Sequence, residues 1–165
     1  MEAFRMKAGD VLLFIGGNDL IDEGIRLEEG SKFTHAALAI SETEFVEAWW
    51  TGVRRRSILE YNNVCVFTPI PPLSVIQQVE IIGYALGKIG EEYNFLQLLG
   101  FLIEKIMHIK YNPFRSKHKT ICSQLVVQAY FDALGIELLP DMETYSAAPS
   151  DLANSELLRQ EDLNV

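Results

Sequence analysis

The sequence predicts a single α+β domain. Short apolar segments bounded by turn residues fill the first 69 positions, a pattern that is typical of β-strands. Longer segments with apolar residues at helical spacing follow a proline-rich stretch at residues 69–72. The 165 residues match the size of one domain, and a hydrophobic content of 48% is enough for a buried core. Because no repeat, low-complexity tract or linker interrupts the chain, we expect residues 1–165 to form one domain.

Five segments have the composition of β-strands. Two of them flank a polar turn at residues 41–43, which predicts an antiparallel hairpin. The segments at residues 11–15 and 64–69 are apolar runs that end at glycine and proline, and residues 53–57 are expected to form a short further strand. The five expected strands are residues 11–15, 34–40, 44–50, 53–57 and 64–69.

The apolar spacing predicts helices in the rest of the chain. Ser74 is placed to cap a helix that runs to about Ile89, and Gly135 is placed as the C-cap of a helix over residues 123–134. Further helical segments are expected at residues 18–30, at residues 95–109 and as one last turn after residue 148. We expect the helix that starts after Ser74 to bury five apolar residues: Val75, Ile76, Val79, Ile82 and Leu86.

The charge of the chain excludes one class of partner. The formal net charge is −9, whereas non-specific nucleic-acid binding needs a basic surface. The basic run Arg54-Arg55-Arg56 is short, and we interpret it as a solvated strand end. The N-terminus lacks a signal-peptide pattern, and polar residues interrupt the most apolar long segment, residues 95–109. We therefore expect a soluble cytoplasmic protein with no transmembrane segment, although export by an unrecognised route stays open.

The two cysteines stand in different settings. Cys65 lies in an apolar strand segment, where cysteine packs as a small hydrophobe. Cys122 comes at the expected start of a helix, where the macrodipole favours the thiolate and unpaired N–H groups can bind an oxyanion. Two cysteines make no disulfide framework, so we expect two free thiols. Position alone leaves Cys122 either a nucleophile or a buried packing residue.

His35 and Glu47 add the partners that a thiol nucleophile needs. They are 12 positions apart with a turn between them, so an antiparallel hairpin would bring them together on one side. A thiol, an imidazole and a carboxylate are the parts of a cysteine hydrolase. The alternatives are a structural strand histidine and a glutamate that faces water.

Metal and cofactor sites are not expected. The two cysteines and three histidines show no metal-ligand spacing. Gly16-Gly17 is not followed by the lysine and hydroxyl residue of a phosphate loop. Trp49 and Trp50 are either core residues or the lining of a substrate cleft, and we expect at least one to be core.

Taken together, six short motifs resemble the circularly permuted NlpC/papain-like cysteine hydrolases, in particular the YaeF/YiiX-like branch. They occur in the same order as in that group and span most of the chain. The motifs are Gly9-Asp10-Val11-Leu12, Thr34-His35-Ala36-Ala37-Leu38, Val46-Glu47-Ala48, Tyr93-Asn94-Phe95, Ile121-Cys122-Ser123-Gln124-Leu125-Val126 and Pro149-Ser150-Asp151-Leu152.

The resemblance implies a fold and roles for particular residues. The fold would be a permuted papain-like one, with a small antiparallel β-sheet or barrel packed against helices and the nucleophile at a helix N-terminus. Cys122 would be the nucleophile, His35 the general base and acid, and Glu47 the orienting residue. We also expect substrate contacts from three residues near these: Trp49, Tyr93 and Ser123.

Three functions remain open. The first is a cysteine peptidase or amidase that acts through an acyl-enzyme, which the resemblance favours. The second is a thiol acyltransferase or lipid-modifying enzyme on the same fold, and the third is a non-catalytic binding module. The substrate would be a small molecule, a peptide or a lipid-like compound, and the absence of an export signal argues against a direct role at the cell wall.

Overall fold

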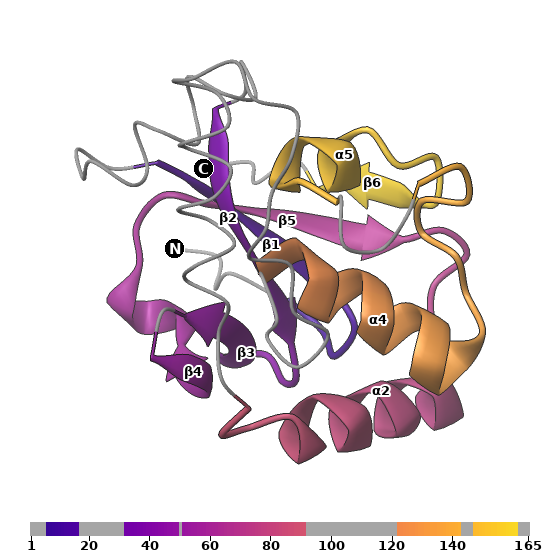
Figure 1. Cartoon of the computed structure of the whole chain (residues 1–165), viewed down its shortest axis with the longest axis horizontal. Coiled ribbons are helices and arrows are strands. Elements are labelled where there is room, and N and C mark those ends of the chain that lie inside the picture. The colour runs from indigo at the N-terminus through magenta and orange to yellow at the C-terminus, as the bar shows by residue number, and fades with distance from the viewer. Residues whose placement is uncertain (1–5, 17–31, 50, 92–121, 143–146, 162–165) are drawn as a thin grey trace, which may run out of the picture.

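A six-stranded antiparallel sheet organises the fold of this computed structural model, which describes residues 6–16, 32–49, 51–91, 122–142 and 147–161 (Figure 1). The strand order is β4-β3-β2-β1-β5-β6. All five predicted strands are present, each within a residue of its expected bounds. The strands are β1 (Val11–Ile15), β2 (Phe33–Ala39), β3 (Glu44–Trp49), β4 (Gly52–Ser57), β5 (Val64–Pro69) and β6 (Leu158–Gln160).

The sixth strand was not predicted. β6 has only three residues, and two of them are exposed, so it shows no alternating pattern in the sequence. It exists because the end of the chain returns to pair with β5, where Phe67 pairs with Gln160 and Pro69 with Leu158. The sheet therefore joins the two ends of the described chain.

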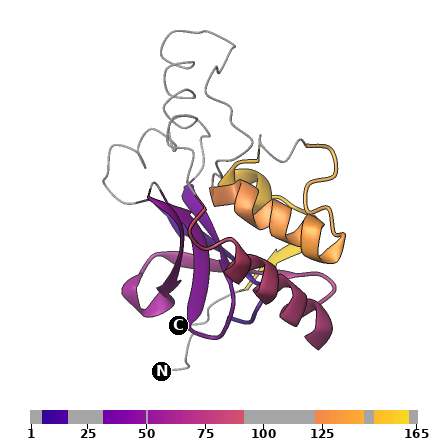
Figure 2. The same cartoon turned by 60° about the horizontal axis from the view of Figure 1, so that its bottom comes forward.

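Two long helices lie side by side over the sheet, and two short elements complete the described chain (Figures 1 and 2). The helices are α2 (Val75–Gly87), α4 (Cys122–Leu134) and α5 (Pro149–Ala153), with a 3-10 turn η1 (Ile58–Glu60). The helix expected over residues 123–134 and the last turn after residue 148 are confirmed. The helices expected at residues 18–30 and 95–109 lie outside the described residues.

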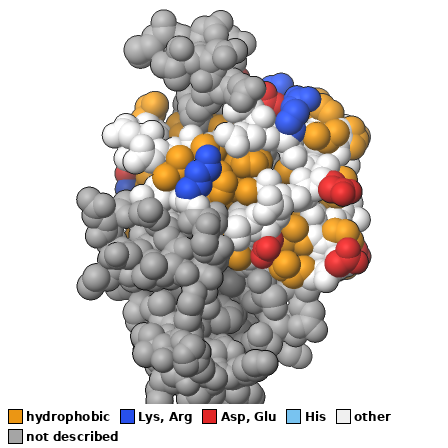
Figure 3. All heavy atoms as spheres, turned by 90° about the horizontal axis from the view of Figure 1, so that it is seen from above, with side chains coloured by type: hydrophobic (Ala, Val, Ile, Leu, Met, Phe, Trp, Pro, Cys, Tyr) orange, Lys and Arg blue, Asp and Glu red, His pale blue; other side chains and the backbone are white. Residues whose placement is uncertain are grey.

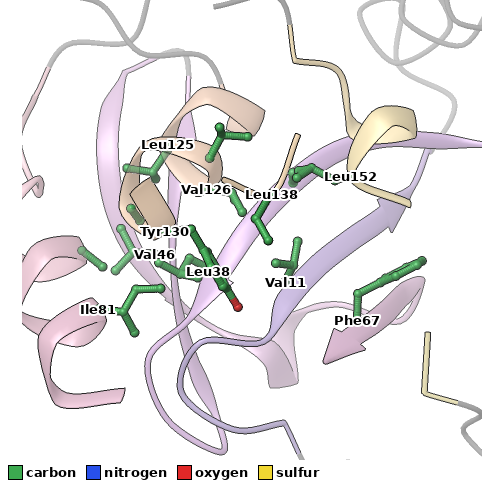
Figure 4. Packing of buried hydrophobic residues seen from close by; sticks show 14 of the residues in the cluster. Val11, Leu38, Val46, Phe67, Ile81, Leu125, Val126, Tyr130, Leu138 and Leu152 are labelled. Atoms are coloured by element: carbon green, nitrogen blue, oxygen red, sulfur yellow. The ribbon is translucent and has the colours of Figure 1, made fainter. Parts of the chain in front are cut away.

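The main core lies between the sheet and the helices (Figure 4). Consecutive strand residues point to opposite faces, so Leu12 and Leu13 in β1 join different hydrophobic clusters. Leu13 belongs to the cluster against the helices, and Leu12 to a second cluster on the other face. The buried members of the main cluster labelled in Figure 4 are Val11, Leu38, Val46, Phe67, Ile81, Leu125, Val126, Tyr130, Leu138 and Leu152.

The predicted buried face of α2 is wrong, although its cap is confirmed. Ser74 and Gln77 form the reciprocal capping hydrogen bonds. Ile81 and Ala85 are fully buried, whereas Val75 is 76% and Val79 63% exposed. Ile76 and Leu86 are exposed too, and only Ile82 of the predicted set packs against the core. The rotation of the helix follows from packing against α4, which the apolar pattern alone did not specify because α2 is apolar on more than one face.

The turn before β1 and the end of α4 hold that helix in place. Tyr130 in α4 donates a buried hydrogen bond to the carbonyl of Gly9. Gly9 has φ +92°, which strains any other residue, and a Cβ there would also meet the Leu73 side chain, so the position needs glycine. Gly135, with φ +66°, ends α4 as predicted, because its N–H bonds to the carbonyl of Phe131. These contacts position the start of α4 relative to the sheet.

The surface in Figure 3 mixes side-chain types. Hydrophobic side chains are interspersed there with acidic and basic ones, so no single sign of charge covers the visible described part of this face. Among the helices of the described residues, none has both the length and the apolar character needed to cross a bilayer.

Candidate active site

The hairpin of β2 and β3 brings His35 and Glu47 together. Leu38 pairs with Val46 and Ala39 with Phe45, and this register places His35 and Glu47 on the same face of the sheet. Their side chains meet where His35 Nε2 lies 2.6 Å from Glu47 Oε2. The proximity expected from the sequence is confirmed.

Glu47 is a buried carboxylate with a partner on each oxygen. Its side chain is 0% exposed, so a glutamate that faces water is excluded. Oε1 accepts a hydrogen bond from Arg54 Nε at 2.8 Å, and the Tyr61 hydroxyl lies 3.5 Å away. Burial opposes ionisation, but the hydrogen bonds and charges of His35 and Arg54 hold the pKa of Glu47 below its usual value. Glu47 is therefore ionised at neutral pH.

Cys122 is the first residue of α4 and is buried against His35. Its thiol lies close enough to the His35 imidazole and to the backbone of Ala36 for both to act on its charge. Burial acts to raise the pKa of the thiol, but the His35 hydrogen bond and charge lower it below the usual value. Burial also disfavours the imidazolium, yet bonds to Cys122 and Glu47 raise the pKa of His35 to about 10. The two shifts favour the charged forms, a thiolate on Cys122 beside an imidazolium on His35.

Aromatic rings fix the plane of the imidazole. Phe14 from β1 lies on one side, with ring centroids 5.3 Å apart. Trp49 from β3 meets the His35 ring edge-on at 5.4 Å and 89°. The guanidinium carbon of Arg54 in turn lies 4.6 Å from the centre of the Trp49 ring. His35 thus contacts residues from three other elements, which restricts its rotation.

The three residues expected to contact substrate have different positions. Trp49 is half-buried beside the imidazole. Ser123 is 1% exposed, and its Oγ lies 3.9 Å from Cys122 Sγ. Tyr93 lies outside the described residues. A role in substrate binding stays a prediction for all three.

The interpretation of Arg54-Arg55-Arg56 as a solvated strand end is wrong for its first residue. Arg54 faces Glu47 across the β3–β4 ladder, whereas Arg55 is 56% exposed and lies 3.6 Å from Glu44. Sequence reasoning missed Arg54 as a site residue. The available signal was the short turn between Trp49 and Gly52, because a tight hairpin there places Arg54 opposite Glu47.

Cys65 is separate from this group. It lies in β5 opposite Leu13 and packs, partly buried, against the main core. Both cysteines are free, as expected. The site therefore contains one thiol, and the chain offers a second as an internal reference.

The fold and site define an α+β protein in which an antiparallel sheet carries His35 and Glu47 and a helix packed on it carries Cys122. The structure is similar to the crystal structure of the metalloprotein YiiX (DUF1105) from Escherichia coli O157:H7. The TM-score is 0.70 at 16% sequence identity, over 95% of this chain and 97% of YiiX. No protein-family model and no curated protein matches the sequence. The similarity supports a YiiX-like fold.

YiiX is described as a metalloprotein, whereas the side chains of this chain show no metal-binding arrangement where the structure describes them. Within the described ranges, no group of three or more His, Cys, Asp and Glu side chains is placed to hold a metal ion. Both oxygens of Glu47 are already engaged, one by His35 and the other by the cationic Arg54. The described residues do not fit a metal centre.

Proposed function

We propose that this chain is a cysteine hydrolase that cleaves an amide or peptide bond, on a circularly permuted NlpC/papain-like fold of the YiiX-like branch. The observation that carries the proposal is the 2.6 Å hydrogen bond between His35 and Glu47, with the buried Cys122 thiol beside His35 at the start of α4. His35 comes from β2, Glu47 from β3 and Cys122 from α4. Along the chain the order is therefore histidine, acidic residue, cysteine, which is the permuted order. The structural similarity to YiiX supports the choice of branch.

Acylation would use the charged forms of Cys122 and His35 that these pKa shifts favour. The thiolate sulfur attacks the carbonyl carbon, so a C–S bond forms and the carbonyl electrons move to oxygen. His35 Nε2 is held by Glu47, which leaves Nδ1 for the thiol side. The imidazolium gives its proton to the leaving nitrogen as the C–N bond breaks. The products of this half-reaction are an amine and a thioester on Cys122.

Deacylation returns the enzyme to its starting state. Neutral His35 takes a proton from water while the water oxygen attacks the thioester carbon. The C–S bond then breaks, which restores the thiolate beside the imidazolium and releases the acid. Glu47 keeps its negative charge throughout and stabilises the imidazolium in both half-reactions.

The start of α4 would stabilise the developing oxyanion. Cys122 is the first helical residue, and N–H groups in the first turn have no acceptor within the helix. The backbone N–H of the nucleophile can therefore donate to the oxygen of the tetrahedral intermediate. The same helix end stabilises the thiolate through its dipole.

Single-site replacement tests the proposal. Cys122→Ala is expected to abolish hydrolysis of a panel of amide and ester probes, while Cys65→Ala retains it. In the unmodified protein, iodoacetamide at neutral pH is expected to label Cys122 before Cys65, as measured by peptide mass spectrometry. Hydrolysis that survives in folded Cys122→Ala, or faster labelling of Cys65, would contradict the assignment.

The other two functions are separated by the products. A thiol acyltransferase would pass the acyl group to an added amine or lipid acceptor in preference to water, so product analysis with and without acceptor distinguishes it from a hydrolase. A binding module would form no acyl-enzyme with any probe. The electrostatic coupling of Cys122 with His35, which lowers the pKa of the thiol, favours an enzyme over a binding module.

A further inference from the structure

Arg54 lies behind the carboxylate that holds His35. We propose that Arg54 is a positioning residue, which holds Glu47 and Trp49 in the arrangement that orients the His35 imidazole toward Cys122. The inference rests on the proposed function. It concerns a residue that touches neither the thiol nor the imidazole in the structure.

The contacts form a closed ring of four side chains. Glu47 binds His35 through Oε2 at 2.6 Å and Arg54 through Oε1 at 2.8 Å. Arg54 stacks over Trp49 at 4.6 Å, and Trp49 meets the edge of His35 at 5.4 Å. Each member is thus held by two others. A change at Arg54 removes support from both groups that touch the imidazole.

The charge of Arg54 matters because Glu47 has no contact with solvent. The charged or titratable groups described as facing Glu47 are His35 from β2, Arg54 from β4 and the Tyr61 hydroxyl after η1. Cys122 from α4 faces His35 in turn. With Arg54 removed, His35 is the one cation left beside the buried carboxylate among the residues that the structure describes, and burial acts to raise the pKa of Glu47. As pH falls, Glu47 then becomes protonated sooner, and the imidazolium loses its counterion.

An arginine suits this position better than a lysine. The planar guanidinium can donate to Glu47 from its edge while its face lies on the Trp49 ring. An ammonium keeps the charge but cannot stack and donate in the same way. We therefore expect Arg54→Lys to preserve part of the effect and Arg54→Met to lose it.

The pH dependence of Cys122 alkylation by iodoacetamide tests the role of Arg54. Arg55→Met is the matched control, because Arg55 is the next residue of β4 and points away toward Glu44. The acid limb is the pH range in which the rate of Cys122 alkylation rises with pH. In Arg54→Met this limb is expected to move to higher pH by about one unit, so that at a given pH within it labelling is about tenfold slower. Arg54→Lys should move it less, and Arg55→Met should leave it where the unmodified protein has it.

The outcomes decide the proposal separately from the hydrolase assignment. An acid limb in Arg54→Met at the same pH as in Arg55→Met would overturn the role of Arg54. If Arg54→Met does not fold by circular dichroism, Arg54→Lys decides, and an unmoved limb in that variant would also overturn it. Alkylation needs no substrate, so a failure to hydrolyse any probe leaves this result readable.

A second readout uses the inactive protein. The Cys122→Ala variant with isotope-labelled histidine is expected to show a downfield NMR signal for the proton between His35 Nε2 and Glu47. Adding Arg54→Met should shift or broaden that signal, whereas adding Arg55→Met should not. An identical His35 signal in both double variants would contradict the positioning role, whatever the activity of the unmodified protein.

Discussion

Replacement of Glu47 by glutamine gives the sharpest test of the proposed charge arrangement. The amide keeps the shape of the side chain but removes the negative charge that faces both His35 and Arg54. Glu44 is the matched control, because it lies on the same strand, is 42% exposed and has only a distant partner in Arg55. Glu47→Gln and Glu44→Gln therefore differ in burial and partners, not in chemistry.

The size of the effect follows from the buried hydrogen bond. A hydrogen bond to a charged group contributes about 1.5–3 kcal/mol, and each 1.36 kcal/mol is a factor of ten in rate. Because the Glu47 side chain is 0% exposed, water does not screen its interaction with His35. We expect the kcat/KM of Glu47→Gln on an amide probe to fall by about 10- to 100-fold. The rate should be unchanged in Glu44→Gln.

The pH range over which Glu47→Gln hydrolyses the probe should be narrower than that of the unmodified protein, at both its acid and its alkaline end. Bonds to Cys122 and Glu47 raise the pKa of His35 from 6.5 to about 10, so the imidazolium is lost as pH rises through that value. Without the carboxylate, the pKa of His35 falls and the alkaline limb moves below 10. A less stable imidazolium supports the thiolate less, so the pKa of Cys122 rises and the acid limb moves up.

The assay is hydrolysis of one amide probe across the pH range in the unmodified protein and the two glutamine variants. Circular dichroism confirms that each variant is folded. If Glu47→Gln keeps the same two limbs and the same maximal rate as Glu44→Gln, the carboxylate does not support the imidazolium and the reasoning is refuted.

Two further predictions concern stability, measured as the free energy of unfolding in urea. Gly9→Ala should destabilise the protein by about 1–3 kcal/mol, because alanine is strained at this φ and its Cβ meets the Leu73 side chain. Gly83→Ala should stabilise the protein by about 0.5–1 kcal/mol, because Gly83 lies in α2 and nothing contacts a Cβ there. Equal effects of the two changes would contradict the close packing at Gly9. Ile81→Ala should cost about 2–5 kcal/mol and Val79→Ala less than about 0.5 kcal/mol, because Ile81 is 0% and Val79 63% exposed. The reverse order would mean that α2 packs against α4 and the core with its other face.

Local rules explain which elements could be predicted. Ser74 and Gln77 mark the start of α2, and Gly135 marks the end of α4, because caps depend on residues only a few positions away. The proximity of His35 and Glu47 also followed from a local feature, the turn between two adjacent strands. Contacts of this kind are encoded within about a dozen residues.

Packing explains what could not be predicted. The buried face of α2 depends on how that helix meets α4, where Tyr84 also donates a hydrogen bond to Asp132. β6 depends on the return of the chain to β5. Neither depends on a local pattern, because each partner lies far away in the sequence.

The sequence by itself determined the α+β class, the five strands of the first half and the pairing of a histidine with a glutamate across one hairpin. Only the tertiary structure placed the thiol of Cys122 against His35 and the guanidinium of Arg54 behind Glu47. The physical reason is that α4 takes its position from packing on the sheet and from the bond between Tyr130 and Gly9, on elements distant in the chain.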